Sequence, residues 1–253
     1  MKTLILYWHG LGDNILATPA IKKFKTTTGD YVGWMMMERL LPAKLMDSNP
    51  YIDQIHGCSD AWHCAGSENI VAGSQVVREE AKKVAEKYEY DRIIEINHNN
   101  LSQHKIITTA TDLGVVLGPQ ELKTELYKSP VDLTPYYEKI KLPDEYVFFN
   151  GIAGLKTKTL PLEYAKKWLD AKGITLPIVS PDFTWDVETT PIHFAIEVMR
   201  GATHRILADS VMYHAAHAGN MHVDLAYFQR GLRIWEEVKP LHVDDRNSIV
   251  TSL

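Results

Sequence analysis

Three segments of the chain combine glycine, acidic, lysine or hydroxyl residues in patterns that could bind a substrate and move a proton. They are HGLGD at 9–13, NGIAGLKTKTLP at 150–161 and LADSVMYHAAHAG at 207–219. Each follows an apolar run and leads into a predicted helix, so each is expected to be a loop after a buried strand. The question is which chemistry these loops could perform.

Asp13 is the acidic residue of the first segment, and two explanations fit it. Gly10 and Gly12 beside it allow unusual backbone angles and the close approach of a ligand. The segment lacks the third glycine of a dinucleotide fingerprint and the Lys-Ser/Thr of a P-loop. Asp13 could act as a general base toward a hydroxyl group. Alternatively it caps the helix expected to begin at Asn14, and both roles can hold together.

The other two segments carry groups suited to a diphosphate. Lys158 supplies positive charge, and Gly154 lies in a flexible stretch whose backbone N–H groups could meet an anion. Asp209 and Ser210 precede a short helix from Val211, and its first turn leaves N–H groups free. The plain alternatives are an exposed lysine-bearing loop and helix capping by Asp209 or Ser210.

His214 and His217 lie three residues apart on that last helix, a spacing that could suggest a metal site. No third ligand follows at a matching spacing, so we predict that no metal is bound. Because no complete dinucleotide fingerprint follows a predicted strand, we also predict no cofactor.

The elements that position these segments alternate between strand and helix. Apolar runs predict strands at 3–8, 31–36, 52–56, 92–97, 146–150, 175–180, 205–208 and 222–228. Helical periodicity predicts helices at 14–27, 75–88, 102–113, 162–172, 191–200 and 211–218. This alternation predicts an α/β fold with parallel sheets covered by helices. Ligands of such sheets bind beyond the carboxyl ends of the strands, where the three segments fall.

The stretch 127–144 interrupts the alternation, because it holds Pro130, Pro135 and Pro143 among charged residues. Such a composition is typical of a linker between domains. We therefore predict two Rossmann-like domains, at 1–135 and 136–253, facing a central cleft.

The composition excludes several classes of partner. The chain has 253 residues, 45% of them hydrophobic, and a formal net charge of −5. This suits a soluble globular protein and gives no basic footprint for nucleic acid. No apolar run approaches the roughly 20 residues of a transmembrane segment. Cys58 and Cys64 make no disulfide framework, so we expect a cytoplasmic protein with reduced thiols.

Five segments, taken in order from Thr3 to about Phe228, resemble glycosyltransferase family 9, the heptosyltransferases. They are HGLGDNILATPAIKKFK, NPYIDQI, KYEYDRIIEIN, KTLPLEYAKKWL and LADSVMYHAAHAG. The resemblance implies a GT-B fold and an inverting, metal-independent transfer of heptose or a related sugar. The implied donor is a nucleotide-diphosphate sugar and the implied acceptor a glycan or glycolipid hydroxyl, which leaves peripheral membrane contact open.

The resemblance also implies roles for individual residues. It matches Asp13 to the catalytic base, Lys158 to the lysine on the donor phosphate and Asp209 to the acid on the donor sugar. The remaining candidates for substrate binding are Gly10 and Gly12 in the first turn, Gly154 near phosphate, Ser210 and His214 in the donor loop, Thr190 near the nucleobase, and Asp182 or Asp186 at the ribose.

Two other functions fit the same fold. A nucleotide-sugar epimerase or hydrolase would act on the donor without an acceptor. A non-catalytic relative that binds sugar nucleotides is the other, because Val211 stands where the family has glycine.

Overall fold

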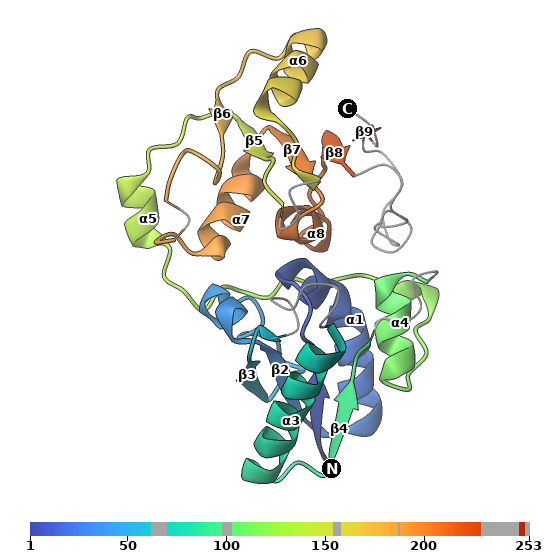
Figure 1. Cartoon of the computed structure of the whole chain (residues 1–253). Helices are drawn as coiled ribbons and strands as arrows, with labels where there is room; N and C mark the ends of the chain where they lie inside the picture. Colours follow the sequence, from blue (N-terminus) through green and yellow to red (C-terminus); the bar gives the residue numbers. More distant parts are fainter. Residues whose placement is uncertain (62–69, 98–102, 154–157, 187, 229–247, 251–253) are drawn as a thin grey trace. The chain divides into compact units, whose positions relative to one another are not determined.

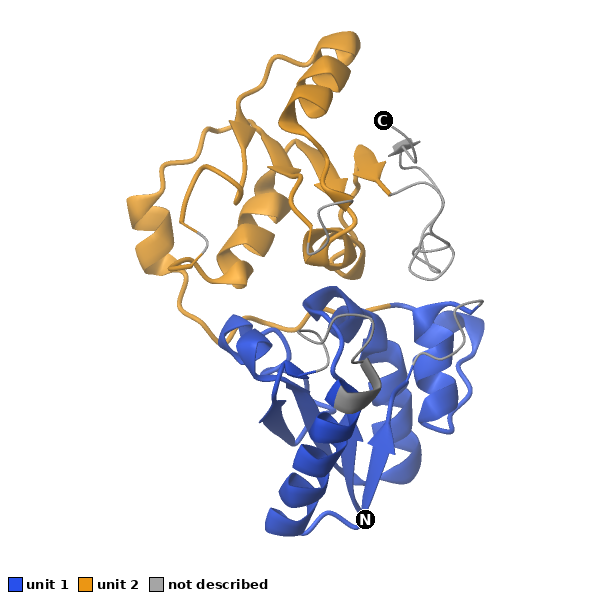
Figure 2. Cartoon of the chain, in the orientation of Figure 1, with its two compact units in different colours: residues 1–123 blue, residues 124–253 orange. Residues whose placement is uncertain are grey.

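The computed structural model describes residues 1–61, 70–97, 103–153, 158–186, 188–228 and 248–250. The chain divides into two compact units, unit 1 (Met1–Lys123) and unit 2 (Thr124–Leu253), which Figure 2 shows in blue and orange. The sequence-based domains differ from these units in where residues 124–135 belong. The assignment of an acceptor side and a donor side to the two domains stays a prediction.

Unit 1 is built on a parallel sheet with the strand order β3-β2-β1-β4 (Figure 1). Its strands are β1 (Lys2–Leu6), β2 (Tyr31–Met37), β3 (Gln54–Cys58) and β4 (Arg92–Glu95). Its helices are α1 (Leu11–Thr28), α3 (Ile70–Lys87) and α4 (Lys105–Asp112), with short 3-10 helices η1 (Glu38–Ala43) and η2 (Pro119–Glu121). The chain leaves β1 toward β2 on one side and returns to β4 on the other. The switch point of this sheet therefore lies between β1 and β4.

The core of unit 1 joins the sheet to its helices through buried apolar side chains. Leu4, Ile5 and Leu6 of β1 are fully buried, as a strand covered on both faces requires. Helix α3 packs against β1, β3 and β4, and α1 packs against α4. The loop after β1 is thus carried on a rigid support.

Pro19 stands inside α1, where the sequence predicts a bend. Because proline has no N–H group, the carbonyl of Ile15 lacks its usual helical partner. The Oγ1 of Thr18 donates a hydrogen bond to that carbonyl at 2.7 Å and takes the place of the missing donor. The helix continues without interruption from Leu11 to Thr28.

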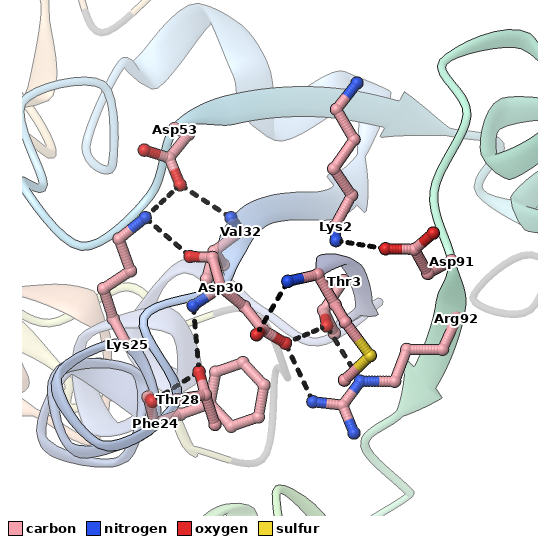
Figure 3. Close-up of polar contacts among 11 residues, drawn as sticks. Lys2, Thr3, Phe24, Lys25, Thr28, Asp30, Val32, Asp53, Asp91 and Arg92 are labelled. Carbon is pink, nitrogen blue, oxygen red and sulfur yellow. Dashed lines mark hydrogen bonds and ion pairs between the residues drawn. The ribbon is translucent and has the colours of Figure 1, made fainter.

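Figure 3 shows a charge cluster at the amino ends of β1, β2 and β4. The Asp30 carboxylate accepts hydrogen bonds from Thr3 Oγ1 at 2.7 Å, from Arg92 Nη2 at 2.9 Å and from the terminal ammonium of Met1 at 3.3 Å. The hydrogen bond from Thr3 is the largest influence on the pKa of Asp30. With the bonds from Arg92 and the N-terminus it outweighs burial and lowers the pKa of this carboxyl. The cluster links the amino ends of these strands. Asp13 follows the carboxyl end of β1 and so lies at the other end of the sheet.

Unit 2 contains a second parallel sheet, with the strand order β6-β5-β7-β8-β9. Its strands are β5 (Val147–Asn150), β6 (Ile178–Val179), β7 (His204–Ala208), β8 (Leu225–Tyr227) and β9 (Ser248–Val250). Its helices are α5 (Thr134–Lys139), α6 (Leu162–Lys172), α7 (Ile192–Gly201) and α8 (Val211–Ala218). The order places the switch point of this sheet between β5 and β7.

The predicted α/β class with parallel sheets is confirmed in both units. Among the described residues, the sequence did not predict helix α5, strand β9 or the short 3-10 helices η1 and η2. Helix α5 lies in the proline-rich stretch assigned to a linker. Pro135 stands in its first turn, where a helix tolerates proline because that N–H would have no partner.

Candidate functional site

The loop after β1 is fixed by the fully buried side chain of Asn14. The amide nitrogen donates to the carbonyl oxygens of His9 at 3.2 Å and Gly10 at 2.9 Å. The amide oxygen accepts a hydrogen bond from Trp34 Nε1 at 2.8 Å. Both hydrogens and the oxygen of this amide are used, so the loop is held in one conformation against the core.

Asp13 is the third residue of α1, and each of its carboxylate oxygens has a partner. Oδ2 accepts from the N–H of Gly10 at 3.2 Å, and Oδ1 pairs with Lys105 Nζ at 2.5 Å. Gly10 is the N-cap of the helix, so the prediction that Asp13 is the cap itself is wrong. The Asp13 side chain is still 19% exposed. Because a carboxylate oxygen has more than one acceptor site, the group can still accept a proton from a bound hydroxyl.

The glycines of this segment have ordinary backbone conformations. Gly10 has φ −63° and ψ 168°, and Gly12 lies within α1. The expectation of unusual backbone angles is therefore wrong for this turn, which adopts conformations open to other residues. That a substrate comes close to these two glycines remains a prediction.

Lys105, the first residue of α4, is the functional candidate that the sequence did not reveal. It lies 92 positions from Asp13 in the chain. The two meet because β1 and β4 are neighbours, so the segments that follow these strands share the switch point of the sheet. Strand order was the signal that could have found it, and the sequence pattern alone does not give strand order.

His9 and Tyr7 contribute neutral groups around the Asp13–Lys105 pair. His9 donates from Nε2 to the carbonyl of Ile96 at 3.2 Å, and burial lowers the pKa of His9 to about 4 although the charge of Asp13 opposes this. The Tyr7 hydroxyl donates to the main-chain carbonyl of Asp13 at 2.8 Å. Burial, followed by the charge of Asp13, raises the pKa of Tyr7 well above its usual value. Near neutral pH, Asp13 and Lys105 are therefore the charged members of this group.

Unit 2 carries a buried ionic group formed by Lys158, Asp209 and His214. Lys158 Nζ lies 2.6 Å from Asp209 Oδ2, and His214 Nε2 lies 3.6 Å from Asp209 Oδ1. The Asp209 side chain is 4% exposed. Burial is the largest influence on its pKa and acts upward, but the hydrogen bond and charge of His214 and the charge of Lys158 together lower it. Asp209 is a fixed negative charge beside a fixed positive one.

Ser210 links this group to the end of β5. Its Oγ accepts from the N–H of Met212 at 3.3 Å, so Ser210 caps α8 as the structural alternative predicted. The same hydroxyl donates to Asn150 Oδ1 at 2.8 Å. The Asn150 amide donates to Asp182 Oδ1 at 2.9 Å, and Asp182 Oδ2 accepts from the N–H of Gly151 at 2.8 Å. One network thus spans the switch point between β5 and β7.

Gly151 is required where the loop bearing Lys158 leaves β5. A Cβ at this position would lie 2.3 Å from the carbonyl oxygen of Leu160, which is too close for any side chain. The N–H of Leu160 donates to the carbonyl of Gly151 at 2.8 Å and closes the loop at its base. The close approach of two backbone segments explains this glycine and holds Leu160, two residues after Lys158, against the end of β5.

The remaining predicted site residues lie in different surroundings. Thr190 is half-buried just before Pro191, the N-cap of α7, and makes no side-chain hydrogen bond within the described residues. Asp186 is exposed and bonds to Glu188 N and Thr189 Oγ1, whereas Asp182 belongs to the network at β5. Gly154 lies outside the described residues.

Two absences in the described part of the chain concern metals and membranes. No group of three His, Cys, Asp or Glu side chains there could hold a metal ion. No helix in the same residues has both the length and the apolar character needed to cross a membrane.

Comparison with protein-family models and with curated proteins finds no match for this sequence. Solved structures do match over nearly the whole chain. The glycosyl transferase family 9 structure from Veillonella parvula DSM 2008 is 14% identical, covers 99% of this chain and 86% of its own, and has a TM-score of 0.64. This chain has the fold of a family 9 glycosyltransferase.

Two Escherichia coli structures show the same likeness. ADP-heptose lps heptosyltransferase II is 15% identical, with 99% of this chain and 90% of that chain covered and a TM-score of 0.61. Heptosyltransferase WaaC with ADP is 14% identical, with 100% and 94% covered and a TM-score of 0.55. The predicted resemblance and the two-domain α/β fold are confirmed at the level of the fold.

Proposed function

We propose that this protein transfers a sugar from a nucleotide-diphosphate donor to a hydroxyl group of a glycan or glycolipid. The observation that carries the proposal is the pairing of two different sites. The Lys158–Asp209–Ser210 group at the switch point of unit 2 contains a buried carboxylate, whereas the Asp13 carboxylate of unit 1 is partly exposed. Both groups occur in a fold shared with two heptosyltransferases, one of them a complex with ADP.

The donor diphosphate binds in unit 2 in this proposal. Lys158 offers an ammonium group, and the first turn of α8 offers backbone N–H groups and the positive end of a helix dipole. Both stabilise the negative charge that builds on the diphosphate as it leaves. Asp209, held ionised, accepts hydrogen bonds from the hydroxyls of the donor sugar. His214 and Ser210 keep this carboxylate and the start of α8 in position.

The acceptor hydroxyl loses its proton to Asp13 in this proposal. The oxygen attacks the anomeric carbon of the donor sugar while the bond to the diphosphate breaks on the opposite face, which inverts the configuration. The proton ends on the Asp13 carboxylate, and both electrons of the broken bond leave with the diphosphate. Inversion and independence from metal rest on the resemblance of the sequence segments to the family. His9 is neutral near pH 7 because burial lowers its pKa to about 4, and its Nε2–H donates to the carbonyl of Ile96.

The test is a panel of ADP-, UDP-, GDP- and CMP-sugars, first for binding by calorimetry and then for products with and without glycan and glycolipid acceptors. ADP-heptose comes first, because one structure of this fold is an ADP-heptose transferase. A sugar joined to the acceptor supports the proposal. An isomerised donor or free sugar without acceptor favours an epimerase or hydrolase. Binding without any turnover favours a non-catalytic relative, and the absence of binding by every donor contradicts the proposal.

A further inference from the structure

We propose that Lys105 is the positioning residue for Asp13, holding its carboxylate ionised and in one orientation for proton transfer. This inference rests on the proposed function, in which Asp13 is the base. It follows from contacts that tie two segments 92 positions apart in the chain.

The Asp13 carboxylate is held at both ends. Gly10 N–H fixes Oδ2 from the start of α1, and Lys105 Nζ fixes Oδ1 from the start of α4. The first contact is local and keeps the side chain near its own helix. The second contact comes from α4, so the two contacts together restrict the rotation of the carboxylate plane. The carboxylate therefore faces a substrate proton in a defined orientation.

Lys105 is a cation in contact with Asp13, and the described groups around the pair are neutral or acidic. His9, in the loop after β1, is neutral because burial lowers its pKa to about 4. Tyr7, directly after β1, keeps its proton, and Asp112, at the end of α4, is a further negative charge near Tyr7. The side chains of Asp13 and Lys105 are 19% and 23% exposed. A partly buried pair is screened less by salt than a surface pair.

The sign of the effect follows from this arrangement. An adjacent positive charge favours the ionised carboxylate and lowers its pKa, typically by about 1–3 units at contact distance. Removing the charge therefore raises the pKa of Asp13, and the acid limb of the transfer profile moves to higher pH. Removing the contact also lets the carboxylate rotate, and misplacement of a catalytic group by about 1 Å can cost on the order of 100-fold in rate.

The experiment compares Lys105→Met, which keeps an unbranched side chain one atom shorter and removes the charge, with Lys105→Arg, which keeps the charge. Lys82→Met is the matched control, because Lys82 is an exposed lysine of α3 paired with Glu79 in the same helix. Three quantities are measured: the donor dissociation constant, kcat/KM against pH, and the carboxyl ¹³C shift of Asp13 against pH. Asp13→Asn identifies the Asp13 signal.

We expect Lys105→Met to lower kcat by about 10- to 100-fold at neutral pH. The midpoint of the acid limb of kcat/KM and the midpoint of the Asp13 carboxyl shift should both move to higher pH, by about one unit. Donor affinity should be unchanged, and Lys105→Arg should recover most of the rate. If Lys105→Met leaves the acid limb and the NMR midpoint where they are, the inference is wrong. Should the parent protein transfer no sugar, the proposed function fails, and the NMR midpoint alone then decides whether Lys105 controls the ionisation of Asp13.

Discussion

Each unit has a lysine–aspartate pair at the switch point of its sheet. The two units differ in which of the two strands is followed by the acid and which by the lysine. In unit 1 the acid, Asp13, follows the first strand and Lys105 follows β4. In unit 2 Lys158 follows the first strand, β5, and the acid, Asp209, follows β7. A parallel sheet with a switch point thus brings two distant segments together whichever of them carries the acid.

The difference between the two carboxylates lies in their surroundings. Asp13 is 19% exposed and pairs with Lys105. Asp209 is 4% exposed and lies between Lys158 and His214, which together lower its pKa despite burial. A partly exposed carboxylate can gain and lose a proton during a reaction. A buried carboxylate whose pKa is lowered by its neighbours stays ionised. In the proposed function, unit 1 therefore supplies the base and unit 2 binds the donor.

The largest effect is expected from Asp13→Asn, which keeps the hydrogen bond from Gly10 possible and removes the base. Proton transfer by a positioned group is worth about 10²–10⁴-fold, so the rate of sugar transfer should fall by this factor. Steady-state assays with a saturating donor measure it. Asp47→Asn, a change at an exposed acid of the same unit, is the control and should keep the parental rate.

Lys158→Met tests the donor side of the comparison. A charged hydrogen bond to phosphate contributes about 1.5–3 kcal/mol, so the donor dissociation constant should rise by about 10- to 100-fold. Calorimetry measures this change. Thermal unfolding measures how much unit 2 is destabilised when the buried Asp209 carboxylate loses Lys158 as its partner. Lys166→Met, at an exposed lysine of α6 paired with Glu163, should change neither quantity. Equal donor affinity in the two variants would remove Lys158 from the donor site.

Asp30 extends the comparison to the opposite edge of the unit 1 sheet, where a carboxylate has a structural role. Asp30→Asn should lower the free energy of unfolding by about 1–3 kcal/mol, because it weakens a buried bond to Thr3 and a partly buried one to Arg92 (Figure 3). Asp91→Asn is the matched control, since Asp91 is exposed and bonds to Lys2 N at the same edge.

The pH dependence of that loss has a definite sign. The pKa of Asp30 is lowered in the folded protein, so its contribution is fully present above the ordinary carboxyl pKa of 3.8. It is lost as the pH falls through the lowered folded value. Urea unfolding of the parent and of Asp30→Asn should therefore differ near neutral pH and converge in acid. A constant difference across this range would show that the charge of Asp30 is not what matters.

The smallest effect concerns His9, whose pKa is lowered to about 4 by burial. Its imidazole signals should stay constant between about pH 5.5 and 8, where an exposed histidine would titrate. Proton NMR of the His9 ring measures this. A midpoint near 6.5 for His9 would place a second titrating group beside Asp13 and blunt the contrast between the two units.

Much of the fold follows from local sequence signals. Helix α6 runs from Leu162 to Lys172 as predicted, because Gly173 ends it in a left-handed conformation. Helix α8 also has its predicted bounds, set by Ser210 at its start. Local signals failed at α5, where proline in a first turn resembles a linker, and at the short strand β9.

The candidate residues Asp13, Lys158, Asp209 and Ser210 could be selected from the sequence, because each follows a predicted strand and ligands of parallel sheets bind beyond the strand ends. Their roles stay predictions. Lys105 was missed because its contact with Asp13 depends on which strands are neighbours, and long-range packing decides that. Asp13 was predicted as the N-cap, but the N-cap is Gly10, three residues earlier, because the helix begins at Leu11 rather than Asn14.

The division of labour between the units is tested most directly by measuring donor affinity and single-turnover transfer for Asp13→Asn and Lys158→Met side by side. Asp13→Asn is expected to bind donor as the parent does and to lose about 10²–10⁴-fold in transfer. Lys158→Met is expected to show the larger loss of donor affinity. Transfer at the parental rate by Asp13→Asn, or a loss of donor affinity in that variant equal to that of Lys158→Met, would contradict the proposed roles of the two units.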